Sequence, residues 1–186
     1  RRLDNGKFIA MTQTLTLTRL MFLLSITLVI QLLGLPQPVT GPLVNFMLII
    51  TTLMVSATGG AILGCLTPLL AVLRGQLPAP LAPMIPFILL ANLAYVALFA
   101  WIMDRQANAA ARYYLRNGLA ITAAAALKFI VLYAAARILL PLLLGRTLPP
   151  ALISIMALPQ LLTALMGGGF AVFFYRLWRR KTAAHT

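Results

Sequence analysis

The stretch AAALKFIVLYAAARILLPLL, residues 124–143, decides the fold class of this chain. It is long and apolar enough to cross the hydrocarbon core of a bilayer, which takes about 20 residues in a helix. Lys128 stands inside the stretch, although an ammonium group is costly at that depth. The stretch therefore predicts a membrane-spanning helix that carries a functional polar residue.

The composition of the whole chain agrees with this assignment. Of its 186 residues 62% are hydrophobic and 9% are charged, whereas about 25% of the residues of a soluble domain are charged. The 15 basic residues outnumber two acidic ones, and most of them lie in turns and at the ends of apolar stretches, where anionic lipid headgroups attract them. We therefore expect membrane lipid, and no nucleic acid, as a partner of these charges.

Six apolar stretches divide the chain, at about residues 17–35, 43–57, 61–73, 83–103, 119–144 and 151–178. The proline-rich segment PQPVTGP, residues 36–42, predicts the first turn, and Gly59-Gly60 predicts a tight turn between the second and third stretches. The pattern predicts an all-α integral membrane protein, in which residues 1–186 form a single domain of six transmembrane helices.

The basic residues also predict an orientation. They gather before the first stretch, in the polar connector at 104–118 and at the C-terminal end, so the positive-inside rule places both the N and C termini in the cytoplasm. We expect a flexible N-terminal extension over residues 1–13, with Met11 as a candidate natural start, and a cytoplasmic tail over 179–186. Whether residues 1–10 and His185 are native is open, and His185 is not expected to be a ligand.

The polar residues exclude several classes of chemistry. The two acids, Asp4 and Asp104, lie outside the apolar stretches, which excludes carboxylate proton relays and intramembrane aspartate proteases. The sequence has no Gly-rich phosphate loop and no nucleophile with a matching base, and its one cysteine, Cys65, cannot form a multi-cysteine metal site. We expect a protein that is not an enzyme and holds no cofactor and no metal.

Three polar side chains are expected to share one layer of the membrane. At about 1.5 Å per residue, Asn92, Lys128 and Gln160 each lie roughly 14–16 Å from one end of their stretch, in a core about 30 Å thick. Their common depth predicts a polar pocket between the last three helices. Lys128 is expected to face an anionic or polar ligand there, and Tyr95 is expected to form an aromatic wall. The alternative for Asn92 and Gln160 is plain hydrogen bonding between helices.

The proline-rich turns and the small residues have separate predicted roles. The turns at 36–42 and 75–83 are expected to cover the pocket mouth, with Thr40 and Asn45 reaching toward the ligand, although plain connectors would look the same. Arg137 is expected to reach the lipid headgroups. The spacing of Gly60 and Gly64 and the run at 167–169 predict close helix packing.

Several segments resemble one family of membrane proteins. The segments are LPQPVTGPLVN at 35–45, GCLTPLLAVLRGQLPAPLAPMIPFILLAN at 64–92 and LPQLLTALMGGG at 158–169. Together with six short spans, they resemble the substrate-binding S component of energy-coupling-factor (ECF) type ABC importers for vitamins and related micronutrients in prokaryotes. The resemblance covers roughly residues 15–178 and leaves the ligand unnamed.

The resemblance implies a division of labour between subunits. The S component would capture a small water-soluble micronutrient from outside the prokaryotic plasma membrane, as a multi-pass protein of that membrane, and a membrane coupling subunit with two ATPase subunits would supply the energy. In the family an Ala-x-x-x-Ala pair on the first helix contacts the coupling subunit. Here Thr18 and Ser25 stand on that helix instead, so the exact coupling surface stays open. The resemblance also leaves open whether the coupling module is dedicated to this protein or shared.

The sequence is also compatible with two other functions. One is a stand-alone small transporter or channel, which would need an ion-coupling device although no carboxylate lies within a span. The other is a membrane scaffold subunit that binds no ligand.

Overall fold

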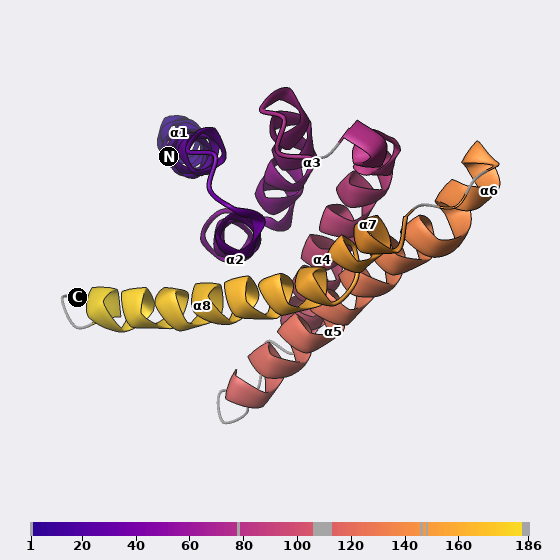
Figure 1. The fold of residues 1–186 in the computed structure, drawn as a ribbon. Coiled ribbons are helices and arrows are strands. Elements are labelled where there is room, and N and C mark those ends of the chain that lie inside the picture. Colours follow the sequence, from indigo (N-terminus) through magenta and orange to yellow (C-terminus); the bar gives the residue numbers. More distant parts are fainter. Residues whose placement is uncertain (1, 78, 106–112, 146, 148, 184–186) are drawn as a thin grey trace.

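The computed structural model describes residues 2–77, 79–105, 113–145, 147 and 149–183. Every regular element among them is helical, which confirms the all-α prediction (Figure 1). Residues 106–112 of the polar connector at 104–118 lie outside the described residues, as do residues 184–186 of the predicted tail, His185 among them. The elements are α1 (Arg2–Leu32), α2 (Gln37–Met54), α3 (Ala57–Leu73), η1 (Ala79–Met84), α4 (Ile85–Arg105), α5 (Tyr113–Ala134), the π-helix η3 (Ala135–Leu139), α6 (Leu140–Leu144), α7 (Pro150–Ile155) and α8 (Leu158–Ala183).

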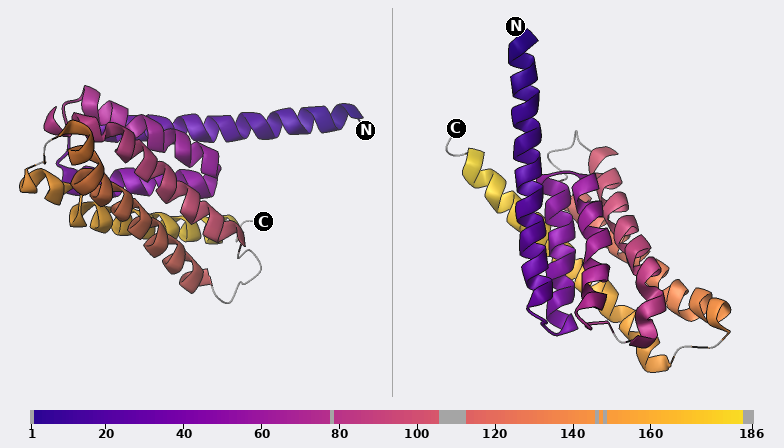
Figure 2. Two further views of the ribbon diagram at one scale, coloured as in Figure 1. Left: turned by 90° about the vertical axis from the view of Figure 1, so that its right-hand side faces the viewer. Right: turned by 90° about the horizontal axis from the view of Figure 1, so that it is seen from above.

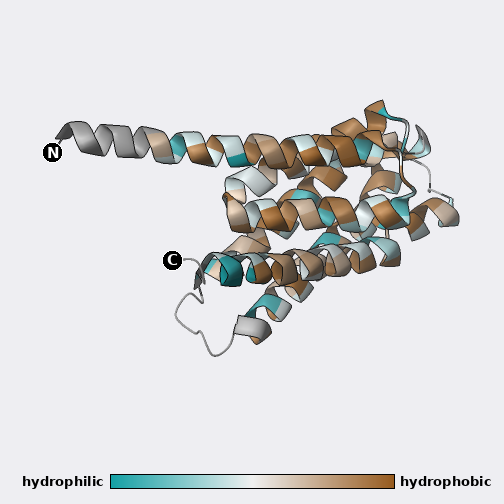
Figure 3. Ribbon diagram, turned by 90° about the vertical axis from the view of Figure 1, so that its left-hand side faces the viewer, coloured by the Kyte–Doolittle hydropathy of each residue, from teal (hydrophilic) through white to brown (hydrophobic). Residues whose placement is uncertain are grey.

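Five helical segments are long and apolar enough to cross a membrane: Met11–Leu32, Gln37–Met54, Pro80–Asp104, Leu115–Leu144 and Pro150–Thr182. The helix Ala57–Leu73 is apolar but shorter, and it accounts for the third of the six predicted stretches. Large hydrophobic side chains are exposed along the outside of these helices, among them Phe22, Leu142, Phe170 and Phe173. The chain is therefore a multi-pass membrane protein (Figure 3).

The start of α1 and the end of α8 lie toward the same end of the bundle, and the turn after α1 and the ends of α3 and α6 lie at the opposite end (Figure 2). Helix α1 begins at Arg2 and projects beyond the other helices at that shared end (Figure 2). Most of the predicted N-terminal extension therefore continues the first helix.

The first predicted turn is wrong in its position. Gln37 opens α2, and Pro38 occupies the first turn of that helix, where the missing N–H of proline costs nothing because the first N–H groups have no partner in the helix. The Thr40 hydroxyl donates to the carbonyl oxygens of Leu35 and Pro36, at 2.7 and 3.3 Å. Only residues 33–36 form the connection, and most of PQPVTGP is the start of a helix.

The predicted turn at Gly59-Gly60 is also misplaced, by about one helical turn. The chain turns at Val55 and Ser56, and Ser56 caps α3 by accepting a 3.0 Å hydrogen bond from the N–H of Gly59. The glycines lie inside α3 and are there for packing. A Cβ on Gly60 would meet Thr52 and the Leu48 carbonyl of α2, and one on Gly64 would lie 3.2 Å from the Cβ of Asn92.

The fifth span contains a π-helix for an identifiable reason. Pro141 has no N–H to donate and its ring crowds the carbonyl one turn earlier. The chain widens by one residue just before it, and the N–H of Leu140 bonds to the carbonyl of Ala135. Arg137 lies in this segment with an exposed side chain, a position that suits its predicted contact with lipid headgroups.

Helix α8 lies against α2 and crosses α5, and glycines make this packing close (Figure 1). A Cβ on Gly167 would clash with the carbonyl of Pro42 and lie 2.7 Å from the Cβ of Asn45. A Cβ on Gly168 would lie 2.5 Å from the Tyr95 hydroxyl, whereas one on Gly169 would meet nothing within 4 Å. The predicted close packing at 167–169 thus holds for the first two glycines.

We predict opposite effects of alanine at two neighbouring glycines. Gly167→Ala should lower the free energy of unfolding by about 1–3 kcal/mol, because the backbone of α2 cannot move aside. Gly169→Ala should be neutral or stabilising by up to about 1 kcal/mol through helix propensity. Thermal unfolding in detergent micelles measures both, and equal destabilisation by the two variants would contradict the packing described here.

Candidate functional site

Lys128 is 4% exposed and lies at the centre of the bundle. Its ammonium group donates to the Oδ1 of Asn45 at 2.6 Å and to the Oδ1 of Asn92 at 2.8 Å. Asn45 comes from α2 and Asn92 from α4, so the lysine of α5 joins three helices. A buried charge without partners is prohibitively costly, and here two amide dipoles provide the compensation.

The two asparagines are themselves held in one orientation. The Nδ2 of Asn45 donates to the carbonyl of Gly41 at 2.9 Å and to the Thr163 hydroxyl at 3.4 Å. The Nδ2 of Asn92 donates to the carbonyl of Gly64 at 3.0 Å. Because each NH₂ group is engaged by neighbouring oxygens, each amide presents its oxygen to the ammonium. The close approach at Gly64 serves this orientation.

Tyr95 lies beneath the lysine and is fully buried. Its ring centre is 5.4 Å from the Lys128 Nζ, and its hydroxyl donates to the carbonyl of Ala164 at 2.8 Å. A ring at this distance attracts a cation. Tyr95 therefore stabilises the ammonium group through its ring. The sequence analysis expected Tyr95 to be a wall of the pocket, but Tyr95 is not among the residues that line the cavity.

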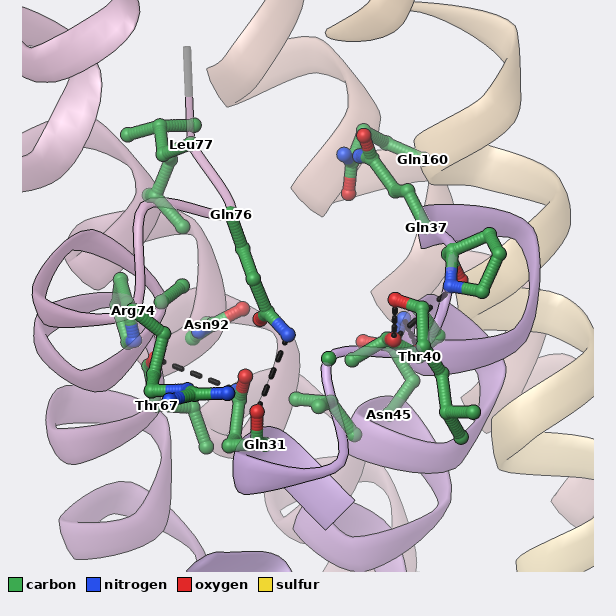
Figure 4. A pocket seen from close by; sticks show the side chains of 18 of the residues that line it. Gln31, Gln37, Thr40, Asn45, Thr67, Arg74, Gln76, Leu77, Asn92 and Gln160 are labelled. Atoms are coloured by element: carbon green, nitrogen blue, oxygen red, sulfur yellow. Dashed lines mark hydrogen bonds between the residues drawn. The ribbon is translucent and has the colours of Figure 1, made fainter. Parts of the chain in front are cut away.

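Above Lys128 a cavity of about 460 Å³ opens toward the turns that follow α1 and α3 (Figure 4). Small-molecule sites in proteins occupy about 300–1,000 Å³. Polar side chains converge on the cavity from α1, α2, α3, α4, α5 and α8, together with the loop after α3, and no acidic residue is among the described residues that line it. The polar lining comprises Gln31, Gln37, Thr40, Asn45, Thr67, Arg74, Gln76, Asn92, Lys128 and Gln160.

Two buried atoms of the cavity wall have no hydrogen-bond partner. They are the Oε1 of Gln31 on α1 and the Oγ1 of Thr67 on α3, whose residues are each 3% exposed. The Nε2 of Gln31 donates to the backbone carbonyl of Thr67 at 3.3 Å, so the two side chains lie side by side. A buried polar atom left unpaired costs about 1–3 kcal/mol, which a ligand that bonds to these atoms would recover.

The cavity mouth is tied together by two side chains of the segment after α3. Arg74 donates from Nη2 to the carbonyl of Leu32 at 2.9 Å. Gln76 donates from Nε2 to the carbonyl of Gln31 at 3.1 Å (Figure 4). Both acceptors belong to the last turn of α1, whose carbonyls have no partner within the helix. The cation of Arg74 also suits the negative end of that helix. This arrangement fixes the rim on the side of α1.

The structure brings most of the predicted site residues together. Asn45, Asn92 and Lys128 form one hydrogen-bonded cluster, and Thr40 lines the cavity near its rim. Gln160 also lines the cavity, but the hydrogen bond that its side chain donates, to the Ile155 carbonyl, is 3.5 Å long. Thr163, one turn further along α8, is the residue that contacts the cluster.

The cavity extends further than the predicted pocket between the last three helices. Gln31, Thr67, Arg74 and Gln76 belong to the first half of the chain. Gln76 lies in the turn at 75–83 that was expected at the pocket mouth, whereas the other three were not expected at the site. The sequence could have pointed to Gln31 as a site residue, because it is a polar residue inside the first apolar stretch. Thr67 gave no such indication, because only the packing of α1 against α3 places it beside the cavity.

The predicted coupling contacts, Thr18 and Ser25, lie on the exposed face of α1. Their hydroxyl groups donate to the carbonyls one turn earlier, those of Thr14 and Met21, both at 2.9 Å. Among the described side chains no group of three or more histidine, cysteine or acidic residues could hold a metal ion.

The comparisons with known proteins returned no match: no family model, no curated protein and no solved structure is similar to this chain at a significant level.

The geometry suits binding of a small molecule. Lys128 has three N–H groups, two of which are used by the asparagines. The unpaired Gln31 Oε1 accepts only, while the Thr67 hydroxyl can donate or accept. The cavity therefore favours a ligand that carries an anionic or carbonyl group and at least one N–H or O–H donor.

We predict that Thr67→Val separates stability from binding. Valine has nearly the shape of threonine and removes the unpaired hydroxyl, so the free energy of unfolding of the empty protein should rise by about 1 kcal/mol. Retention of copurifying small molecules, measured by native mass spectrometry, should fall about tenfold, as for the loss of one hydrogen bond of about 1.4 kcal/mol.

The matched control is Thr51→Val. Its Oγ1 is also buried and unpaired, but Thr51 does not line the cavity. This variant should gain the same stability and leave retention unchanged. Equal retention by the Thr67 and Thr51 variants would contradict a ligand at Thr67.

Proposed function

We propose that this protein is the substrate-binding membrane subunit of an ECF-type ABC importer in a prokaryotic plasma membrane. It captures a small water-soluble vitamin or related micronutrient from outside, and a separate membrane coupling subunit with two ATPases drives its delivery inward. The observation that carries this proposal is a cavity with two unpaired buried polar atoms in its wall and a held ammonium at its floor.

The orientation belongs to the same proposal. The lining of the cavity includes the turn after α1 and the end of α3, which lie at the end of the bundle opposite the start of α1 and the end of α8 (Figure 2). The basic residues favour a cytoplasmic location for the termini, because Arg176, Arg179, Arg180 and Lys181 crowd the end of α8. The cavity mouth would then face the outside, as capture of a nutrient requires.

The sequence supports dependence on partner subunits. It contains no nucleotide-binding loop, Asp4 lies outside the spans, and Asp104 is the last residue of the span Pro80–Asp104. The chain therefore lacks the residues for ATP hydrolysis and has no carboxylate in the interior of a span for ion coupling. A binding subunit of this kind needs an external source of energy.

Filling the cavity tests the binding role directly. Ala71 lines the cavity, whereas Ala97 lies on an exposed face of α4. Ala71→Phe should abolish retention of the copurifying small molecule in native mass spectrometry, and Ala97→Phe should retain it as the unmodified protein does. The molecule released on denaturation would identify the substrate.

The energy requirement is tested in proteoliposomes with that molecule as the substrate. Uptake should need the coupling subunit, both ATPases and ATP. ATP-independent uphill uptake by the purified chain alone would contradict the proposal and indicate a stand-alone transporter. The absence of any retained molecule in the unmodified protein and in Ala97→Phe would contradict it too and indicate a scaffold subunit.

A further inference from the structure

A second cavity, of about 300 Å³, lies between α5 and α8 near the end of the bundle that carries the termini. The two helices cross and then diverge toward the start of α5 and the end of α8 (Figure 1). We call this space the α5–α8 groove. It is separate from the cavity above Lys128, since the two share no lining residue.

The floor of the groove is shaped by two glycines. A Cβ on Gly118 of α5 or on Gly169 of α8 would meet nothing within 4 Å. Gly167 and Gly168 are in tight contact with neighbouring helices, so Gly169 differs from them in facing open space. The missing side chains leave a channel in the apolar surface of the protein.

One face of α8 forms the long wall of the groove. Its lining residues recur at positions 169, 172, 173, 176, 177 and 180, the spacing of a single helical stripe. The stripe is apolar as far as Phe173, which is 63% exposed, and it ends in Arg176 and Arg180. Arg176 and Arg180 are four residues apart and therefore neighbours on the helix surface.

The charge in the groove has one sign. Arg176 and Arg180 are the only charged residues among the described residues that line it. Guanidinium groups bind phosphate with paired hydrogen bonds, and exposed apolar side chains beside them suit an acyl chain. Because the helices span a membrane, the molecule at hand that combines a phosphate with an acyl chain is a phospholipid.

We propose that an anionic phospholipid occupies the α5–α8 groove, with its phosphate at Arg176 and Arg180 and one acyl chain along Phe173 and Gly169. This site does not depend on the proposed transport function. It would fix the diverging ends of α5 and α8 relative to each other in the leaflet at which the chain termini lie.

The test uses the full-length protein in mixed micelles that contain equal amounts of phosphatidylglycerol and phosphatidylcholine with identical chains. Native mass spectrometry should show one retained phosphatidylglycerol and little phosphatidylcholine. Arg176→Gln with Arg180→Gln should weaken phosphatidylglycerol retention by about tenfold or more, because each arginine contributes a charge-assisted hydrogen bond.

The matched control is Arg179→Gln with Lys181→Gln. It removes the same charge from the same helix, but neither residue lines the groove. Retention in this variant should stay within about twofold of the unmodified protein, since exposed charges are screened. An equal loss in both double variants would overturn the site in favour of diffuse attraction, as would equal retention of the two lipids by the unmodified protein.

A third variant tests the acyl-chain part of the site without changing an arginine and without disturbing the fold. Gly169→Leu places a side chain in open space and should exclude the acyl chain, so retention should fall as in the arginine variant while thermal unfolding is unchanged. Glycerol 3-phosphate, which has the phosphate but no chain, should fail to displace the lipid at equal concentration. Unchanged retention in Gly169→Leu, or displacement by glycerol 3-phosphate, would overturn the proposal.

Discussion

The architecture depends on one buried ammonium group and the two amide oxygens that hold it. Lys128 of α5 bonds to Asn45 of α2 and Asn92 of α4. Asn45 is oriented by the Gly41 carbonyl of its own helix and Asn92 by the Gly64 carbonyl of α3. In a low-dielectric interior such a network is strong when every member is satisfied and costly when one is not. The close approaches at Gly64 and Gly167 follow from it, because each brings a helix backbone against one of the asparagines.

The same network determines where a ligand can bind. The polar cluster forms the floor of the cavity, and the unpaired atoms of Gln31 and Thr67 lie in its wall. At the floor two of the three Lys128 N–H groups are paired without a ligand, whereas the two buried wall atoms have no partner at all. Binding energy would therefore come mainly from the wall contributed by α1 and α3, while the floor gives the cavity its shape and positive charge.

The sequence predicted the fold class and the central residues because hydrophobicity and the cost of buried polarity are local signals. Lys128, Asn92 and Asn45 stood out as polar residues in or beside apolar stretches. The predicted turn positions were wrong because proline and glycine occur in helices as well as in turns. Pro38 lies in the first turn of a helix, and Gly60 lets two helices pack closely. Thr67 could not be predicted, since only the contact between α1 and α3 gives it its role. The orientation and the transport function stay predictions.

A double-mutant cycle on the buried cluster tests the central claim most directly. The free energy of unfolding in detergent micelles is measured for Lys128→Met in the unmodified protein and in an Asn45→Leu, Asn92→Leu background. In the unmodified protein the substitution should destabilise by about 1.5–3 kcal/mol, because it leaves two amide oxygens unpaired. In the leucine background it should stabilise, because it removes a buried charge that has lost its partners. Destabilisation of equal size in both backgrounds would contradict the account.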